Sequence, residues 1–124
     1  LHRSDDNGVT WQFITLDAPW QYTRRITPRA DNCGVIFLTN GNGPPGNTGM
    51  IWRSTDWGES WTDTGLPGSL NSTPWCVATD PSDPMLIFAC SNLGQLFRSR
   101  NGGDSWTRLP RELGDVRSMC WMPW

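Results

Sequence analysis

Short apolar runs alternate with clusters of turn-forming residues along this 124-residue chain. Gly, Pro, Asn, Asp and Ser gather between the runs, which is the pattern of β-strands joined by turns. Residues that favour helices are scarce: the chain has thirteen Gly, ten Pro and nine Trp, no Lys, and only two Glu. The pattern therefore predicts an all-β chain.

Two stretches repeat the same order of elements. Residues 25–40 can be laid over residues 77–92 without gaps, and both indicate a strand, a turn rich in Pro and Asx residues, and an apolar strand. Two further strands are expected after each stretch, at residues 50–53, 61–64, 95–98 and 106–109. Four antiparallel strands per repeat are typical of a β-propeller blade.

A stretch with the pattern Ser-x-Asp-x-Gly-x-Thr-Trp precedes each expected fourth strand. The first box (4–11), the second box (54–61) and the third box (99–106) start 50 and 45 positions apart, a period typical of repeat architectures. The Asp side chain can accept hydrogen bonds from the turn backbone, and Gly allows a positive φ. We therefore predict turn locks and not catalytic groups. The structural residues of the boxes are Ser4, Asp6, Gly8, Trp11, Ser54, Asp56, Gly58, Trp61, Ser99, Asn101, Gly103 and Trp106.

The three stretches resemble Asp-boxes, also called BNR repeats. These occur in sialidases, in Asp-box glycoside hydrolases such as xyloglucanases, in sortilin-type receptor domains and in photosystem II assembly factors. The resemblance implies a β-propeller with each box at the outer rim of a blade, between its third and fourth strands and away from the active site. The third box departs from the pattern, with Asn101 in place of Asp. The resemblance identifies a superfamily of many functions, so function has to be argued from particular residues.

The repeats divide the chain into a blade remnant (1–17), two full blades (18–66 and 72–110) and the first strand of a next blade (115–124). We expect the two termini to share a composite third blade. Propeller rings have about four to eight blades, so this unit cannot close a ring alone and would expose sheet faces and edges. It is expected to be a piece of a longer propeller or a homo-oligomer, and a dimer giving a six-bladed ring is favoured.

Charge and cysteine usage limit the possible partners. The net charge of −2 suggests neither a nucleic acid nor an anionic membrane as a partner. No apolar run approaches the ~18 residues of a membrane span, and no signal peptide is visible in this segment, so we expect a soluble chain of unknown compartment. Cys33, Cys76, Cys90 and Cys120 form no C-x-x-C motif, and His2 is the only His. No metal site or cofactor is therefore expected. Cys76 and Cys90 could pair across a hairpin, but we favour four small buried thiols.

Catalysis by this chain alone is not expected. Glycoside hydrolysis usually needs two carboxylates about 5–10 Å apart. The carboxylates outside the boxes that could take this part are Asp31, Asp80, Asp83 and Asp115. The first three lie in predicted turns beside Pro or Asn, where a turn-forming role is favoured. The resemblance to sialidases would also require clustered arginines and a Tyr–Glu pair, and nothing matches that arrangement.

Binding is the expected function. By resemblance, propeller ligands meet the loops that join last to first strands and second to third strands. The candidate ligand-binding residues in those loops are Trp20, Tyr22, Trp75, Asn42 and Asn47. They could stack on a glycan or grip a protein, although Trp20 and Trp75 could instead pack between blades. The insertion at 41–48 could be a ligand loop or a surface excursion. The sequence thus predicts a non-catalytic, self-associating binding or scaffolding module, with a fragment of a larger Asp-box hydrolase as the alternative.

Overall fold

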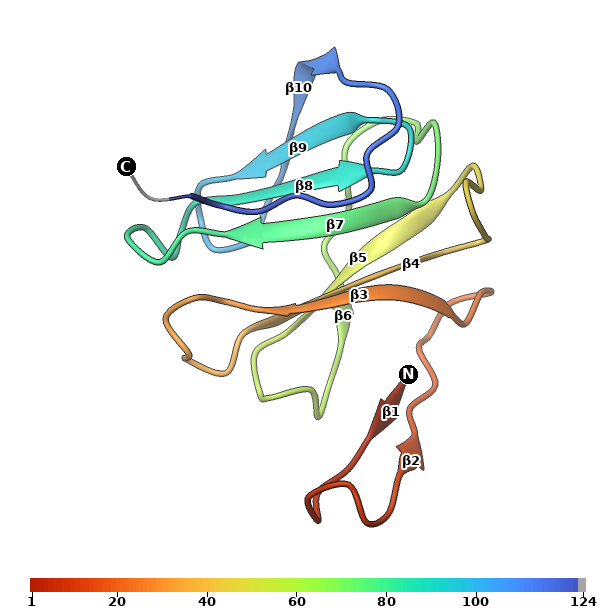
Figure 1. Cartoon of the computed structure of the whole chain (residues 1–124), viewed down its shortest axis with the longest axis vertical. Coiled ribbons are helices and arrows are strands. Elements are labelled where there is room, and N and C mark those ends of the chain that lie inside the picture. Colours follow the sequence, from red (N-terminus) through yellow and green to blue (C-terminus); the bar gives the residue numbers. More distant parts are fainter. Residues whose placement is uncertain (123–124) are drawn as a thin grey trace.

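The computed structural model describes residues 1–122 and contains only strands and connecting turns (Figure 1). This part of the chain has no helix, and hence none long and apolar enough to cross a membrane. The ten strands are β1 (His2–Arg3), β2 (Gln12–Phe13), β3 (Tyr22–Pro28), β4 (Ile36–Gly41), β5 (Gly49–Ser54), β6 (Thr62–Asp63), β7 (Pro74–Thr79), β8 (Ile87–Ser91), β9 (Gln95–Ser99) and β10 (Thr107–Glu112).

The strands form one small and two larger sheets. The first sheet has the order β3-β4-β5-β6, the second sheet has the order β10-β9-β8-β7, and β1 pairs with β2. All neighbouring strands are antiparallel and follow one another along the chain. The prediction of an all-β fold built from four-stranded antiparallel sheets is therefore confirmed.

The strand register corrects the internal alignment by one residue. Ile36 lies opposite Ser54 and Ile87 lies opposite Ser99, and these two serines begin the second and third boxes. Ile36 thus corresponds to Ile87, whereas the gapless alignment of 25–40 with 77–92 matches Ile36 to Phe88. That alignment rests on turn-forming residues, and the apolar runs fit either register. Only the cross-strand hydrogen bonds determine which side chains share a face.

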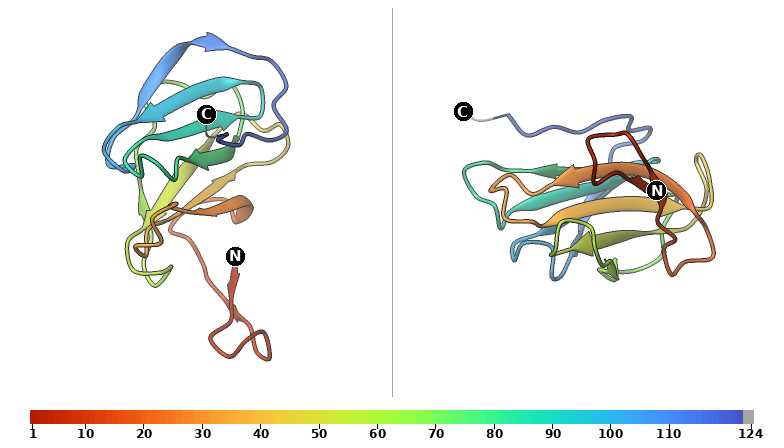
Figure 2. Two further views of the ribbon diagram at one scale, coloured as in Figure 1. Left: turned by 60° about the vertical axis from the view of Figure 1, so that its left-hand side comes forward. Right: turned by 90° about the horizontal axis from the view of Figure 1, so that it is seen from below.

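The two four-stranded sheets lie side by side, with the main core between them (Figures 1 and 2). Phe37 of β4 packs edge-on against Trp106 of the third box, with ring centroids 6.3 Å apart. The other buried members of this core are Val35, Ile51, Val77, Ile87, Ala89 and Phe97. Alternate residues of β4 and β5 point to the opposite face of the first sheet, where Leu38 and Trp52 pack with Leu16.

The termini do not form a composite blade within one chain. The β1–β2 hairpin projects from the rest of the molecule and reaches the first sheet through Leu1 (Figure 2). Residues 115–122 instead follow the face of the second sheet that points away from the first. There the Val116 N–H donates to the Asn92 carbonyl at 2.8 Å and Trp121 stacks on Phe88.

The predicted strand at 115–124 is therefore wrong for residues 115–122, and residues 123–124 lie outside the described part. A strand is defined by hydrogen bonds to a neighbouring strand. Among the described residues, no strand pairs with residues 115–122.

Candidate functional site

The second box is a turn closed by its own side chains. Ser54 Oγ donates to Asp56 Oδ1 at 2.7 Å, and the Gly58 N–H donates to Ser54 Oγ at 2.8 Å. The Ser60 N–H and hydroxyl donate to the Asp56 carboxylate at 3.0 and 2.6 Å. The Asp56 carboxylate is thus an acceptor of several hydrogen bonds inside a seven-residue turn.

The first box repeats this arrangement, and the hydrogen bonds determine the ionisation of both carboxylates. Hydrogen bonds from the Thr10 hydroxyl and N–H, and from Ser4, lower the pKa of Asp6 to about 2. The hydroxyl and N–H of Ser60, with Ser54, lower the pKa of Asp56 to about 2. Both carboxylates are therefore charged near neutral pH and hold no proton for acid catalysis.

Asn101 closes the third box without a charge. Its Oδ1 accepts hydrogen bonds from the Ser99 hydroxyl at 2.8 Å and the Ser105 N–H at 3.0 Å. Its Nδ2 donates to Ser105 Oγ at 2.9 Å, where a carboxylate would accept from that hydroxyl. The reversed direction of this one hydrogen bond keeps the turn intact.

The box tryptophans point toward the repeat that precedes them. Trp106 is 8% exposed and packs on Phe37 of the first sheet, while Trp61 packs on the cluster that the N-terminal segment covers. Trp11 has no preceding sheet in this chain and is 63% exposed. Its indole N–H donates to the Gly8 carbonyl at 3.1 Å, whereas those of Trp61 and Trp106 are buried without a partner among the described residues.

Two ion pairs join neighbouring boxes. Arg3 lies directly before the first box, and its guanidinium is 2.8 Å from the Glu59 carboxylate of the second box. Arg53 lies directly before the second box and pairs with Asp104 of the third box. Hydrogen bonds to Glu59 and to Asp5 raise the pKa of Arg3. These arginines therefore connect successive repeats at the same position.

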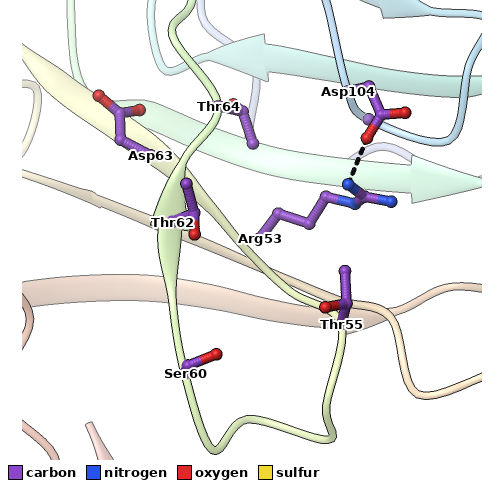
Figure 3. A pocket seen from close by; sticks show the side chains of 8 residues that line it. Arg53, Thr55, Ser60, Thr62, Asp63, Thr64 and Asp104 are labelled. Atoms are coloured by element: carbon purple, nitrogen blue, oxygen red, sulfur yellow. Dashed lines mark hydrogen bonds and ion pairs between the residues drawn. The ribbon is translucent and has the colours of Figure 1, made fainter.

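A polar groove of about 240 Å³ lies beside the Arg53–Asp104 pair (Figure 3). Its remaining walls come from Thr55, Ser60, Thr62, Asp63, Thr64 and Gly103. Several of these polar groups already have partners within the chain: Thr64 Oγ1 donates to the Ile51 carbonyl at 2.8 Å, and Asp63 Oδ1 accepts from the Gly65 N–H at 3.1 Å. The groove is lined by hydroxyl groups and by the carboxylates of Asp63 and Asp104, so it offers a hydrogen-bonding surface.

The amides predicted to bind a ligand instead fix the insertion loop. Asn42 Nδ2 donates to Asn47 Oδ1 at 2.7 Å, and the Asn47 N–H donates to Asn42 Oδ1 at 3.0 Å. Thr73, just before β7, holds the same loop, because its hydroxyl donates to the Gly43 carbonyl at 2.7 Å and its N–H donates to the Pro45 carbonyl at 2.8 Å. The insertion is thereby attached to the following sheet.

The predicted aromatic residues lie in different environments. Trp75 is 3% exposed and packs beside Cys76, with the Arg24 guanidinium 3.9 Å above its ring centroid. Burial at this position favours the packing role that was the alternative for Trp75. Trp20 is half-buried, and Tyr22 presents an exposed ring at the start of β3. Among the three rings, that of Tyr22 is the most exposed.

A second depression of about 240 Å³ contains arginines that the sequence interpretation missed. Arg24, Arg25 and Arg117 line it together with Trp75 and Cys76. Arg117 pairs with Asp115 at 2.7 Å. The signal available in the sequence was the Arg24–Arg25 pair inside a predicted strand, but Arg117 comes close only through the course of the C-terminal segment. The depression is a basic surface on β3 and β7, the first strands of the two sheets.

The four cysteines divide into two classes. Cys76 and Cys90 lie opposite each other in β7 and β8 as buried free thiols. A hydrogen bond from the Cys90 thiol, together with Arg25 and Arg24, lowers the pKa of Cys76 to about 7, while the same contact and burial raise the pKa of Cys90. Cys33 and Cys120 are exposed, so the expectation that all four thiols are buried is wrong for these two.

The carboxylates considered for hydrolysis are engaged locally. Asp80 accepts hydrogen bonds from the Ser82 N–H and hydroxyl at 2.8 and 2.7 Å, and Asp83 accepts from the Met85 N–H at 3.1 Å. Arg29 pairs with Asp31 at 2.8 Å and lowers the pKa of this carboxyl well below its usual range. Within residues 1–122, no three His, Cys, Asp or Glu side chains are grouped so that they could hold a metal ion.

Comparison with known proteins gives the family. No protein-family model matches the chain. The photosystem II assembly lipoprotein Ycf48 of Synechococcus sp. (strain CC9902) is 29% identical over 111 residues, which are 86% of this chain and 29% of Ycf48. A xyloglucanase of Paenibacillus sp. is 29% identical over 119 residues, which are 88% of this chain and 12% of the enzyme. The crystal structure of the GH74 enzyme of Niastella koreensis superposes with a TM-score of 0.70 and 24% identity, covering 86% of this chain and 17% of that one.

These relatives all point to a β-propeller superfamily with Asp-box-like repeats, each over only part of its own length. The two four-stranded sheets are blades, and the three turns are the Asp-boxes. The chain spans 29% of the length of Ycf48 and 12% of the length of the xyloglucanase. Whatever a complete ring does therefore depends on more than these two blades.

Proposed function

We propose that this chain is a segment of an Asp-box propeller ring and acts in it as a non-catalytic binding or scaffolding module. The observation that carries the proposal is the exposed apolar surface of the first box and its hairpin. Val9, Trp11 and Phe13 are 80%, 63% and 56% exposed, and we call them the leading flank. The equivalent tryptophan of the third box is 8% exposed because a blade covers it. Three strongly exposed apolar side chains on one hairpin support a protein interface there.

A binding role, in place of catalysis, is supported by the state of the acidic groups. The box carboxylates are ionised turn locks, and Asp31, Asp80, Asp83 and Asp115 all have partners within two residues. The basic depression offers a different chemistry. Because the first strands of propeller blades surround a central channel, Arg24, Arg25 and Arg117 suit an anionic group of a glycan or protein that enters it.

The test of ring membership is oxidative footprinting of the tryptophans, read by mass spectrometry. In the 14.0 kDa chain at low concentration, we expect Trp11 to be modified much faster than Trp106. In a complete ring, Trp11 should be protected to the level of Trp106. Trp11 that is already protected in the isolated monomer would contradict the proposal, because no blade would then be missing at the leading flank.

The second candidate is a part of a larger Asp-box glycoside hydrolase. It is favoured by the likeness to a xyloglucanase and to a GH74 enzyme. Turnover of aryl glycosides by this chain, lost in Asp80→Asn or Asp83→Asn, would establish it. We expect no turnover, since neither carboxylate is free of local hydrogen bonds.

Completion of the ring by a second copy, as a six-bladed dimer, stays a prediction. This prediction follows from the repeat count. A measurement of the native mass distinguishes it from completion of the ring by other blades.

A further inference from the structure

The two inter-blade ion pairs obey one positional rule. The arginine directly before one box pairs with the acidic residue directly after the box glycine of the next blade. Arg3 pairs with Glu59 in this way at 2.8 Å, and Arg53 pairs with Asp104. We call such a pair a clasp. Because the same contact recurs at both joints, it follows from the propeller geometry and the box sequence together.

The direction of these arginines follows from strand register. Arg53 lies opposite Phe37, and residues paired across antiparallel strands point to the same face. Phe37 packs on Trp106 of the second blade, so Arg53 also faces the second blade. Figure 3 shows the Arg53 side chain pointing toward Asp104, with which it pairs.

Arg98 occupies the same position one blade further on. It lies directly before the third box and opposite Phe88, whose ring stacks on Trp121. Arg98 therefore faces away from the first blade, on the face of the second sheet that residues 115–122 partly cover. We call this face, together with segment 115–122, the trailing face. In the part of the chain that the structure describes, Arg98 has no carboxylate partner.

A second copy of this chain cannot complete the clasp. In a second copy, the second and third boxes already pack against the preceding blade of their own chain. Its first box is therefore the one that could pack against the trailing face. The residue directly after the glycine in that first box is Val9, which carries no charge. A copy seated there would place an apolar side chain over the half-buried guanidinium of Arg98.

We infer that the trailing face is a docking surface for an Asp-box blade that has Asp or Glu directly after its box glycine. This blade is not the one that carries the first box of a second copy. The inference rests on the proposed ring. The clasps are partly exposed, with side chains 21–26% accessible on the arginine side and 61–63% on the acidic side. Such pairs contribute little affinity but select the partner and its register.

The test supplies the missing carboxylate on a copy of the chain. The probe carries Val9→Glu together with Arg98→Gln, so that it offers the acid and cannot form a clasp with itself. The matched control probe carries Val9→Gln and Arg98→Gln. Each is titrated against the parent chain and against Arg98→Gln alone, by sedimentation velocity at low and at high salt.

We expect the acidic probe to bind the parent chain about threefold to fivefold more tightly than the control probe. The difference should disappear at high salt and with Arg98→Gln as the acceptor. Equal affinities, or no association with either probe, would overturn the inference. A parent chain that forms a stable dimer whose affinity is unchanged by Arg98→Gln would overturn it as well. The proposed ring is tested separately, because Trp11 footprinting does not depend on Arg98.

Discussion

Phe37 of the first blade lies so close to Gly103 of the third box that a Cβ at position 103 would be 2.4 Å from the ring carbon Cε1. Gly103 also has a φ of +90°, a backbone conformation that residues with a side chain rarely adopt. One residue thus satisfies two requirements, the bend of a box and the approach of a neighbouring blade. The Asp-box is therefore part of the packing between blades as well as a local turn.

Gly103→Ala is expected to lower the free energy of unfolding by about 2–4 kcal/mol, because backbone strain adds to overpacking against Phe37. Gly58→Ala is the matched control, since Gly58 has a φ of +89° but its added Cβ would approach no atom closer than Trp61 Cζ2 at 3.4 Å. We expect this control to lose only about 1 kcal/mol from strain. Urea denaturation measures both. Equal losses would show that Phe37 can move aside and that the close approach is unimportant.

Replacing Asp56 separates the hydrogen bonds of the box from its charge. Asn101 already closes the third box as an amide, so Asp56→Asn should melt within a few degrees of the parent. Asp56→Ala removes both side-chain acceptor oxygens and leaves the Ser60 N–H and Ser54 hydroxyl without this partner, so its Tm should fall by about 4 °C or more. Scanning calorimetry compares the three proteins. If Asp56→Ala melts like the parent, the carboxylate does not hold the turn.

Acid should loosen the first two boxes before the third. The pKa of Asp6 and of Asp56 falls from an ordinary 3.8 to about 2 on folding. A depressed pKa contributes stability that is complete above about pH 4 and is lost as the pH falls through about 2. The protection of the Thr10 and Ser60 amides, measured as exchange relative to the intrinsic rate at each pH, should therefore fall between pH 4 and pH 2. The protection of the Ser105 amide, beside uncharged Asn101, should change less. An equal loss of protection at all three amides would point to global unfolding instead.

The clasp within the chain should be weak, salt-dependent and specific. In a double-mutant cycle, Arg53→Gln and Asp104→Asn should show a coupling of about 0.2–1 kcal/mol that declines in high salt. Arg98→Gln is the control, because this arginine has no carboxylate partner in the described chain and its loss should leave stability unchanged. Zero coupling at low salt would remove the basis for extending the clasp to Arg98.

The sequence was sufficient to predict the features that depend on residues close together along the chain. The boxes are closed by contacts between residues two to four positions apart, as in Ser54, Asp56 and Gly58, so their pattern is visible in the chain itself. Four strands per repeat follow from the same turns. These features determine the fold class.

The remaining features depend on contacts that the sequence does not show. The clasp joins Arg53 to a residue 51 positions away, and only the strand register determines which face this arginine occupies. Asn42 and Asn47 were predicted as ligand groups from their place in a loop, and the sequence does not reveal that they bond each other. Ligand binding by these amides stays a prediction. The segment 115–122 has the composition of a first strand, but a strand also needs a neighbour.

The native mass of the isolated chain tests the central claim most directly. Light scattering on a sizing column, over a wide range of concentration, should give the 14.0 kDa monomer at low concentration. Any association at high concentration should be weak and should not stop at one size, because we propose that the missing blades are not copies of this chain. A discrete dimer that persists on dilution, with Trp11 protected from oxidation, would contradict this account and show that the ring closes by self-association.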